Sequence, residues 1–129
     1  MILVIMLLLI LIPLEAGQFS KTCYNVRLWY HGELWANCEP SKQSSKISLD
    51  NYVSNGNGKM AVPGNGFSQY CYLFQIFDIN TNNPEDAERP PKGLGAWCKN
   101  EHNKDEWSSI VLDDYIENID GNIQWTGPI

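Results

Sequence analysis

The side chains best suited to chemistry in this sequence are the amides and carboxylates around two turn dipeptides. Asn57-Gly58 and Asp120-Gly121 are each preceded by a further asparagine, at Asn55 and Asn118. Amides and carboxylates at a turn could pair with the vicinal hydroxyls of a neutral sugar, because each hydroxyl both donates and accepts a hydrogen bond. The same residue types also tolerate the positive φ of tight turns, so a purely structural role stays open.

Catalytic chemistry has few candidates. His31 lies at an expected turn, His102 lies in an expected insertion, and the four cysteines are better explained as disulfides. Asp113 and Asp114 are adjacent in sequence, which suits the start of a short helical turn better than two carboxylates facing one substrate. We therefore predict that the chain is not an enzyme.

One segment begins like a calcium-binding loop but does not continue as one. Asp78, Asn80 and Asn82 have the right spacing. Asn83, however, stands where such a loop needs glycine, and Arg89 stands where it needs a bidentate glutamate. We predict no metal site and no cofactor.

Length and charge restrict both the fold and its partners. The chain has 129 residues and a formal net charge of −6, with no cluster of lysine or arginine. Such a surface repels phosphate backbones, so nucleic acid is not expected as a ligand. A chain of this length predicts one small domain.

The N-terminal segment is typical of a secretory signal peptide. Its apolar run, Ile2 to Ile12, is shorter than the ~20 residues that a membrane-spanning helix needs. The small residues Ala16 and Gly17 follow it. We predict that residues 1–17 are cleaved, that the mature chain has no membrane span and that the protein is secreted; an uncleaved anchor is the alternative.

The rest of the chain contains the same pattern twice, in residues 18–63 and 67–125. The offset between matching residues grows from 48 to 63, which places two insertions in the second repeat, the larger within 78–92 and the smaller within 99–107. Repeats of ~50 residues are too small to be stable alone, so we expect one domain over residues 18–129 with a shared core. The matched residues are Phe19, Ser20, Cys23 and Tyr24 with Phe67, Ser68, Cys71 and Tyr72; Leu34, Ala36 and Cys38 with Leu94, Ala96 and Cys98; and Ile47, Leu49, Asp50, Tyr52, Asn55 and Gly58 with Ile110, Leu112, Asp113, Tyr115, Asn118 and Gly121.

Four cysteines in a small exported chain predict two disulfides. The symmetry of the repeats favours Cys23 with Cys38 and Cys71 with Cys98. Pairing across the repeats is the alternative.

Apolar residues alternate with a period of two in each repeat, which predicts strands and an all-β fold. We expect each repeat to form a meander, a short helical turn capped by Asp50 or Asp113, and a hairpin at its turn dipeptide. Trp35 and Trp97 are out of phase with the buried residues. We expect each to be covered by a partner hairpin, and a sugar-stacking surface is the alternative.

The motifs resemble those of one family. They are Phe-Ser-x-Thr-Cys at 19–23, Leu-x-Ala-x-Cys at 34–38 and 94–98, and Leu-Asp-x-x-Ile-x-Asn-Ile-Asp-Gly at 112–121. With them the chain, from about Gln18 to Trp125 apart from 78–92, resembles the cyanovirin-N homologues, a family of mannose-binding lectins. The resemblance implies a pseudo-twofold fold. Each half would combine a three-stranded antiparallel sheet of one repeat with a β-hairpin exchanged from the other, and each disulfide would lie within a repeat.

The resemblance also implies a shallow sugar-binding pocket in each half. The first would be formed by Gln18, Lys21, Thr22, Glu39, Ser41, Asn118, Ile119 and Asp120. The second departs more from the family pattern and is flanked by both insertions. It would be formed by Asn55, Asn57, Asn65, Gln69, Lys99 and Asn100, with Gly66, Tyr70 and Glu101 beside them.

We therefore predict a secreted lectin for high-mannose oligosaccharides with terminal α1,2-linked mannose. Its partners would be mannose-containing glycans or glycoproteins. The linker at 63–66 permits either a monomer or a domain-swapped dimer. The alternative is a secreted interaction module that keeps the lectin scaffold and binds a protein through the 78–92 loop.

Overall fold

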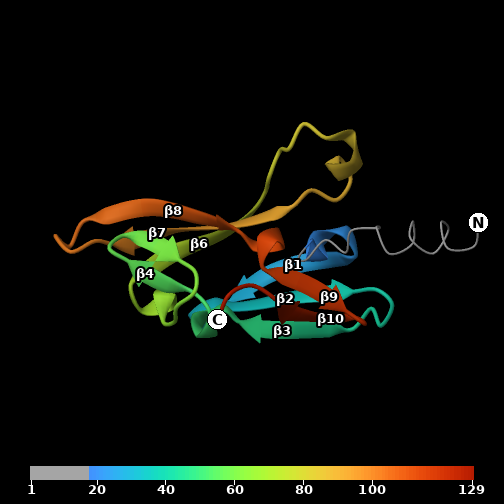
Figure 1. Cartoon of the computed structure of the whole chain (residues 1–129), viewed down its shortest axis with the longest axis horizontal. Coiled ribbons are helices and arrows are strands. Elements are labelled where there is room, and N and C mark those ends of the chain that lie inside the picture. Colours follow the sequence, from blue (N-terminus) through green and yellow to red (C-terminus); the bar gives the residue numbers. More distant parts are fainter. Residues whose placement is uncertain (1–17) are drawn as a thin grey trace, which may run out of the picture.

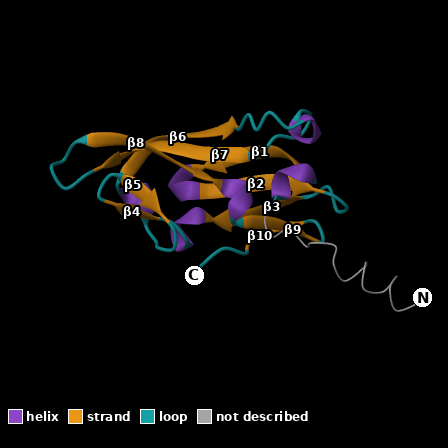
Figure 2. Ribbon diagram, turned by 45° about the horizontal axis from the view of Figure 1, so that its top comes forward, coloured by secondary structure: helices purple, strands orange, loops and turns teal. Residues whose placement is uncertain are grey.

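The computed structural model describes residues 18–129; the predicted signal peptide at 1–17 lies outside this part. Within it the chain forms ten β-strands and six short 3-10 helices, and every strand pairing is antiparallel, which confirms the all-β prediction (Figures 1 and 2). No helix in the described part is long and apolar enough to cross a membrane. The 3-10 helices are η1 (Phe19–Lys21), η2 (Tyr30–Gly32), η3 (Leu49–Asn51), η4 (Phe67–Gln69), η5 (Pro84–Asp86) and η6 (Leu112–Asp114).

The first repeat forms a three-stranded sheet and a hairpin. The sheet has the order β1 (Cys23–Trp29), β2 (Glu33–Cys38), β3 (Ser44–Ser48), and the hairpin is β4 (Ser54–Gly56) with β5 (Lys59–Ala61). His31 and Gly32, with φ of 61° and 73°, turn β1 into β2 as the sequence predicts.

The second repeat forms the same elements. Its sheet has the order β6 (Cys71–Asp78), β7 (Lys92–Lys99), β8 (Asp105–Val111), and its hairpin is β9 (Ile116–Ile119) with β10 (Asn122–Trp125). Even the irregularities recur, because Asn25 in β1 and Leu73 in β6 interrupt the register with φ of 53° and 54°.

Each hairpin packs on the sheet of the other repeat, as the resemblance implies. β10 lies against β3, where the Ile123 N–H donates to Ser45 Oγ at 3.1 Å (Figure 1). β5 lies against β8, where the Met60 N–H donates to Ser108 Oγ at 2.8 Å. Met60 and Ile123 are 63 residues apart in sequence, and so are Ser45 and Ser108. The same contact between hairpin and sheet therefore occurs in both halves.

The core is continuous between the halves and follows the predicted alternation. The side chains at positions 34, 36 and 38 of β2 are buried, while those between them are only half-buried. The buried apolar residues are Phe19, Cys23, Leu34, Ala36, Cys38, Leu49, Val53, Met60, Phe67, Cys71, Leu94, Ala96, Cys98, Leu112, Ile116 and Ile123.

Both disulfides lie within a repeat. Cys23 pairs with Cys38 across β1 and β2, and Cys71 pairs with Cys98 across β6 and β7. Pairing across the repeats is thereby excluded.

The prediction that Asp50 and Asp113 cap short helical turns is wrong. Both 3-10 helices form, but each begins one residue before its aspartate and has no side-chain cap. The carboxylate of Asp113 instead accepts from the Ser20 N–H and hydroxyl at 3.1 and 2.6 Å, and Asp50 accepts from Ser68 in the same way. Each aspartate therefore joins its own repeat to the other one.

The prediction that a partner hairpin covers Trp35 and Trp97 is wrong, because each lies on the outer face of its own sheet. The side chain of Trp97 is 39% exposed on the outer face of the second sheet, where it contacts Trp107. Trp35 is half-buried beside the cations of Arg27 and Lys46. A hairpin needs the inner face of a sheet to bury its apolar residues, so the outer face stays uncovered.

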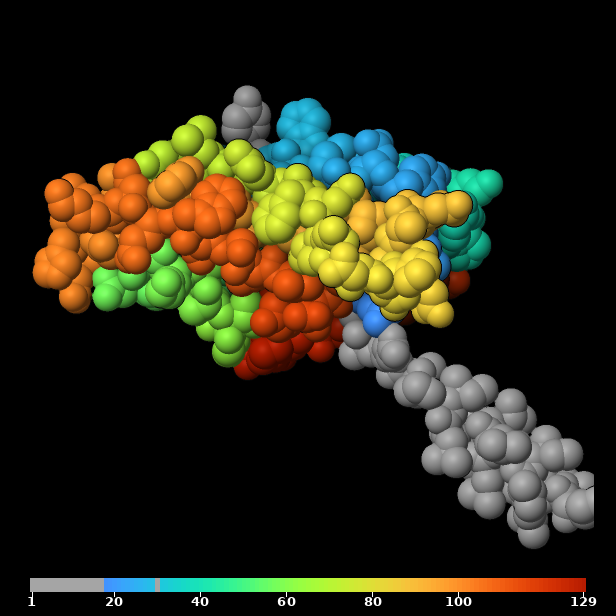
Figure 3. All heavy atoms as spheres, turned by 90° about the horizontal axis from the view of Figure 1, so that it is seen from above, coloured from blue at the N-terminus to red at the C-terminus, as the bar shows by residue number. Residues whose placement is uncertain are grey.

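The larger insertion does not flank the second half alone. It leaves the sheet between β6 and β7 and folds against the first repeat, where its spheres border those of β1 (Figures 1 and 3). Asp86 pairs with Lys21, and the Arg89 guanidinium donates to the backbone oxygen of Cys23 at 3.4 Å. The loop thus lies beside the first predicted pocket.

Candidate functional site

Asn118, near the tip of the β9–β10 hairpin, organises the first candidate site. Its side-chain amide donates to Thr22 Oγ1 at 2.9 Å and to the backbone oxygen of Glu39 at 2.7 Å. Its Oδ1 accepts from the Gly121 N–H at 2.8 Å. Because these bonds use both ends of the amide, Asn118 positions the site more than it offers free groups to a ligand.

The turn beyond Asn118 has the predicted geometry. Asp120 and Gly121 adopt φ of 55° and 93°, as a two-residue hairpin turn of this kind requires. A Cβ on Gly121 would lie 2.5 Å from Ser41 Oγ, so only glycine allows this serine of the β2–β3 turn to approach. The side chains of Glu39, Asp120 and Ile119 are exposed around this contact.

The structure therefore unites most of the first predicted set, which we call the first tip cluster: Thr22, Glu39, Ser41, Asn118, Ile119 and Asp120. Lys21 and Gln18 instead line a hollow of about 460 Å³ facing the 78–92 loop. Lys21 donates to Asp86, and this bond is the main reason why the pKa of the Asp86 carboxyl is lowered. Lys21 is thus engaged by the insertion, a partner that the sequence did not indicate.

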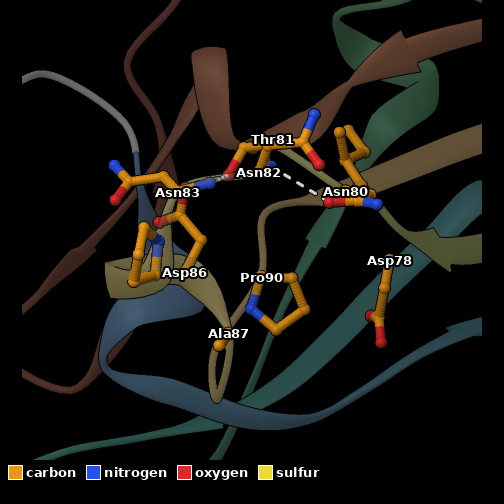
Figure 4. Close-up of a pocket in the computed structure, with 10 residues that line it drawn as sticks. Asp78, Asn80, Thr81, Asn82, Asn83, Asp86, Ala87 and Pro90 are labelled. Atoms are coloured by element: carbon orange, nitrogen blue, oxygen red, sulfur yellow. Dashed lines mark hydrogen bonds between the residues drawn. The ribbon is translucent and has the colours of Figure 1, made fainter.

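The insertion encloses a second hollow, of about 420 Å³, shown in Figure 4. Its polar side chains mostly bond to the loop itself: Asn80 Oδ1 accepts from the Asn82 N–H, and Thr81 Oγ1 accepts from the Asn83 N–H and donates to Asp86. In residues 18–129 no group of three or more histidine, cysteine or acidic side chains could hold a metal ion. These bonds indicate a structural role for the loop's amides.

The corresponding tip of the β4–β5 hairpin is fastened in the same way. Asn55 donates to the backbone oxygen of Lys99 at 2.7 Å and accepts from the Gly58 N–H at 2.8 Å. Asn57 Oδ1 accepts from the Glu101 N–H at 2.7 Å, a residue of the smaller insertion. Asn57, which stands at the position equivalent to Asp120, therefore already uses its side-chain oxygen in a bond within the protein.

The second predicted set is only partly assembled. Asn55, Asn57, Lys99 and Asn100 form what we call the second tip cluster. Asn100 Oδ1 accepts from the backbone N–H groups of residues 102 and 104, both at 2.9 Å. Asn65 and Gln69 are exposed on the segment before β6, and no hydrogen bond in the described part joins their side chains to this cluster.

Lys99 of the second tip cluster also belongs to a group of bonded polar side chains on the outer face of the sheet. Lys99 Nζ lies 2.8 Å from Asp105, which also accepts a hydrogen bond from the Tyr72 hydroxyl. The bond to Lys99, and then the one from Tyr72, lower the pKa of the Asp105 carboxyl, while Asp105 raises the pKa of both partners. Asp105 is held as an anion.

Two kinds of important residue were missed from the sequence. Asp50 and Asp113 were assigned to caps, although their serine partners also recur between the repeats and the repeat pattern could have paired them. Asp105 and Asp86 lie in the insertions, where no repeat partner exists to indicate a contact.

The comparisons identify the fold. The family model of the CVNH domain matches residues 19–124. The NMR structure of the CVNH protein of Gibberella zeae is similar, with a TM-score of 0.71 and 20% identity over 86% of this chain and 99% of that chain. Microvirin in complex with mannobiose has a TM-score of 0.69 and 18% identity over 84% and 98%. A MoCVNH3 variant in complex with (N-GlcNAc)4 has a TM-score of 0.66 and 17% identity over 88% and 99%.

Proposed function

The chain belongs to the CVNH domain family, and from this premise we propose that it is a secreted lectin for high-mannose oligosaccharides with terminal α1,2-linked mannose. The observation that carries the proposal is the first tip cluster. There Asn118 fixes Thr22 and the chain at Glu39 around an exposed Asp120. The mannobiose bound by microvirin supports the choice of sugar.

The chemistry of the first tip cluster suits a neutral disaccharide. Glu39 and Asp120 supply exposed carboxylates, and Thr22 supplies a hydroxyl at the same tip. Carboxylates accept hydrogen bonds from adjacent sugar hydroxyls, while backbone groups of the turn complete the set. Each such bond contributes only about 1 kcal/mol over water, so one shallow site binds weakly.

The second tip cluster is the weaker candidate for sugar binding. Asn57 stands at the position of Asp120, and its side-chain oxygen already accepts from the Glu101 N–H. A sugar would have to displace this bond. Mannose binding is therefore assigned to the first half, and binding through a second site would add avidity only where a glycan spans both.

The proposal has two further parts: the protein binds its sugar without catalysing a reaction, and it is exported from the cell. Both cysteine pairs are disulfides, which persist in oxidising compartments. A protein-interaction role for the 78–92 loop is not favoured, because Asp86 and Arg89 are bonded to the first repeat and the loop's amides are bonded within it.

The test is an NMR titration of the disulfide-intact protein with α1,2-mannobiose. We expect saturable amide shifts at Thr22, Glu39, Asn118 and Asp120, and the loss of these shifts in Asp120→Ala. The matched control is Asn57→Ala, the same change at the equivalent position of the other hairpin, which should keep them. If millimolar mannobiose shifts no amide of the first tip cluster, the proposed function is wrong.

A further inference from the structure

We propose that the outer face of the second sheet is a separate carbohydrate-binding surface that stacks the flat apolar faces of a β1,4-linked pyranose chain. The surface, which we call the aromatic platform, consists of Tyr72, Trp97 and Trp107, with Lys99 and Asp105 at its rim. It does not rest on mannose binding at the first tip cluster. In the view from above, β7 and β8 are uncovered (Figure 3).

The three aromatic side chains share one face of the sheet because they are opposite one another in the strand register. Trp97 of β7 is paired with Tyr72 of β6 on one side and with Trp107 of β8 on the other. Tyr72 and Trp97 are each 39% exposed, and Trp107 is 41% exposed. Large aromatics usually serve the core, so three exposed rings in one row call for a functional explanation.

The two indoles form a corner rather than a stack. Their centroids are 5.6 Å apart and their planes are inclined at 66°. We call Trp107 the floor, because its ring lies against the backbone at Gly95, and we call Trp97 the wall. A ring placed in this corner would contact the face of one indole and the edge of the other.

Gly95 allows the ring of Trp107, the floor of the corner, to lie flat on strand β7. A Cβ on Gly95 would lie 2.3 Å from Cζ2 and 2.5 Å from Cη2 of Trp107. The six-membered ring thus occupies the space above the backbone that any other residue would fill. Gly93 has the same relation to Phe77, whose Cζ would be 2.4 Å from an added Cβ. One face of Trp107 rests on the sheet, and the other is left for a ligand.

The first sheet shows that the fold does not require such a platform. Trp35 occupies the position equivalent to Gly95, and Lys46 Nζ and the Arg27 guanidinium lie 5.1 and 5.7 Å from its ring centroid. The position of Trp107 is held there by Ser44, whose hydroxyl accepts from Arg27 at 3.1 Å. Two cations thus lie beside Trp35. In the described part of the second sheet the cation contact is at Tyr72, whose ring centroid lies 5.9 Å from Lys99 Nζ, and neither indole of the platform has one.

The chemistry of the platform favours sugars with equatorial hydroxyls. In a β1,4-linked glucose chain both ring faces carry only C–H groups, which are attracted to the negative face of an indole. An α1,2-linked mannose has axial oxygens on its faces and fits a flat floor less well. The anion of Asp105 and the ammonium of Lys99 at the rim can bond the equatorial hydroxyls. The same anion, in a chain with a net charge of −6, repels the phosphate backbone of a nucleic acid whose bases would otherwise stack here.

The probe is cellotetraose, followed by NMR of the indole Nε1–H signals. We expect saturable shifts at Trp97 and Trp107 and a loss of affinity of about tenfold or more in Trp107→Ala. The control for removing an exposed indole is Trp29→Ala, because Trp29 is 54% exposed but lies in the first sheet. That variant should bind cellotetraose like the parent.

A second pair of variants tests the flat floor without removing an aromatic ring. Gly95→Ala should lift Trp107 and weaken cellotetraose binding. Gly93→Ala, a change on the same strand that crowds Phe77 of β6 instead, should not. All four variants should keep the mannobiose shifts of the first tip cluster, so this proposal and the mannose proposal fail separately. The platform proposal is overturned if cellotetraose leaves both indoles unshifted, or if Trp107→Ala binds it as the parent does.

Discussion

At the scale of single residues, two aspartate–serine pairs link the repeats. Asp113 is buried and accepts from three donors, the N–H and hydroxyl of Ser20 and the Lys92 N–H at 2.7 Å. Removing a buried acceptor leaves its donors without partners, at a cost of about 1–3 kcal/mol for each group. We expect Asp113→Ala to lower the free energy of unfolding by about 3 kcal/mol or more, measured by urea denaturation.

The neighbouring acid provides a matched control for this change. Asp114 is exposed, so Asp114→Ala should alter the free energy of unfolding by no more than about 0.5 kcal/mol. Asp50 is only half-buried and serves Ser68 alone, so Asp50→Ala should lie between the two. Equal losses in Asp113→Ala and Asp114→Ala would contradict the role assigned to the buried carboxylate.

At the scale of elements, the 78–92 loop is attached to the first half without forming the first tip cluster. Its bonds go to Lys21 and to the backbone of Cys23, whereas the cluster is held by Asn118. Deleting residues 79–90 should therefore leave mannobiose affinity within about threefold of the parent, because only surface contacts are lost. A titration of the shortened chain checks this, and loss of binding would place the loop in the site.

The same attachment makes the loop sensitive to acid. Hydrogen bonds from Lys21 and then Thr81 lower the pKa of Asp86 in the folded protein relative to the unfolded chain. The contact is therefore fully present above the ordinary aspartate pKa and is lost as the pH falls through the lowered value. An NMR titration of the Asp86 carboxyl should show this low value, and Lys21→Met should raise it. An unchanged value in Lys21→Met would contradict the pairing.

The elements also show what the sequence can predict. The turn at Asp120-Gly121 was predictable because the conformational preference of that dipeptide is local. The pairing of Lys21 with Asp86 joins residues 65 apart, and that of Ser20 with Asp113 joins residues 93 apart. Such contacts depend on how the two repeats pack together, including the exchange of hairpins, and no local pattern contains this packing. The family resemblance supplied that exchange, but it gave no guide to an insertion that lies outside the family pattern.

At the scale of the whole molecule, neither half is made from one repeat. The first sheet is covered by β9 and β10, and the second by β4 and β5. A fragment of residues 18–63 would therefore expose the buried faces of Leu34 and Met60, and it would keep its disulfide without gaining a core.

We expect the fragments 18–63 and 64–129, each with its disulfide formed, to be unfolded alone and to fold when mixed. The mixture should recover the amide dispersion of the intact chain, because Ser45 and Ser108 then regain the hairpins that bond to them. Since each fragment retains its disulfide, a failure to fold alone reports the missing hairpin. A dispersed spectrum from 18–63 alone would contradict the shared core and would make each repeat a domain in its own right.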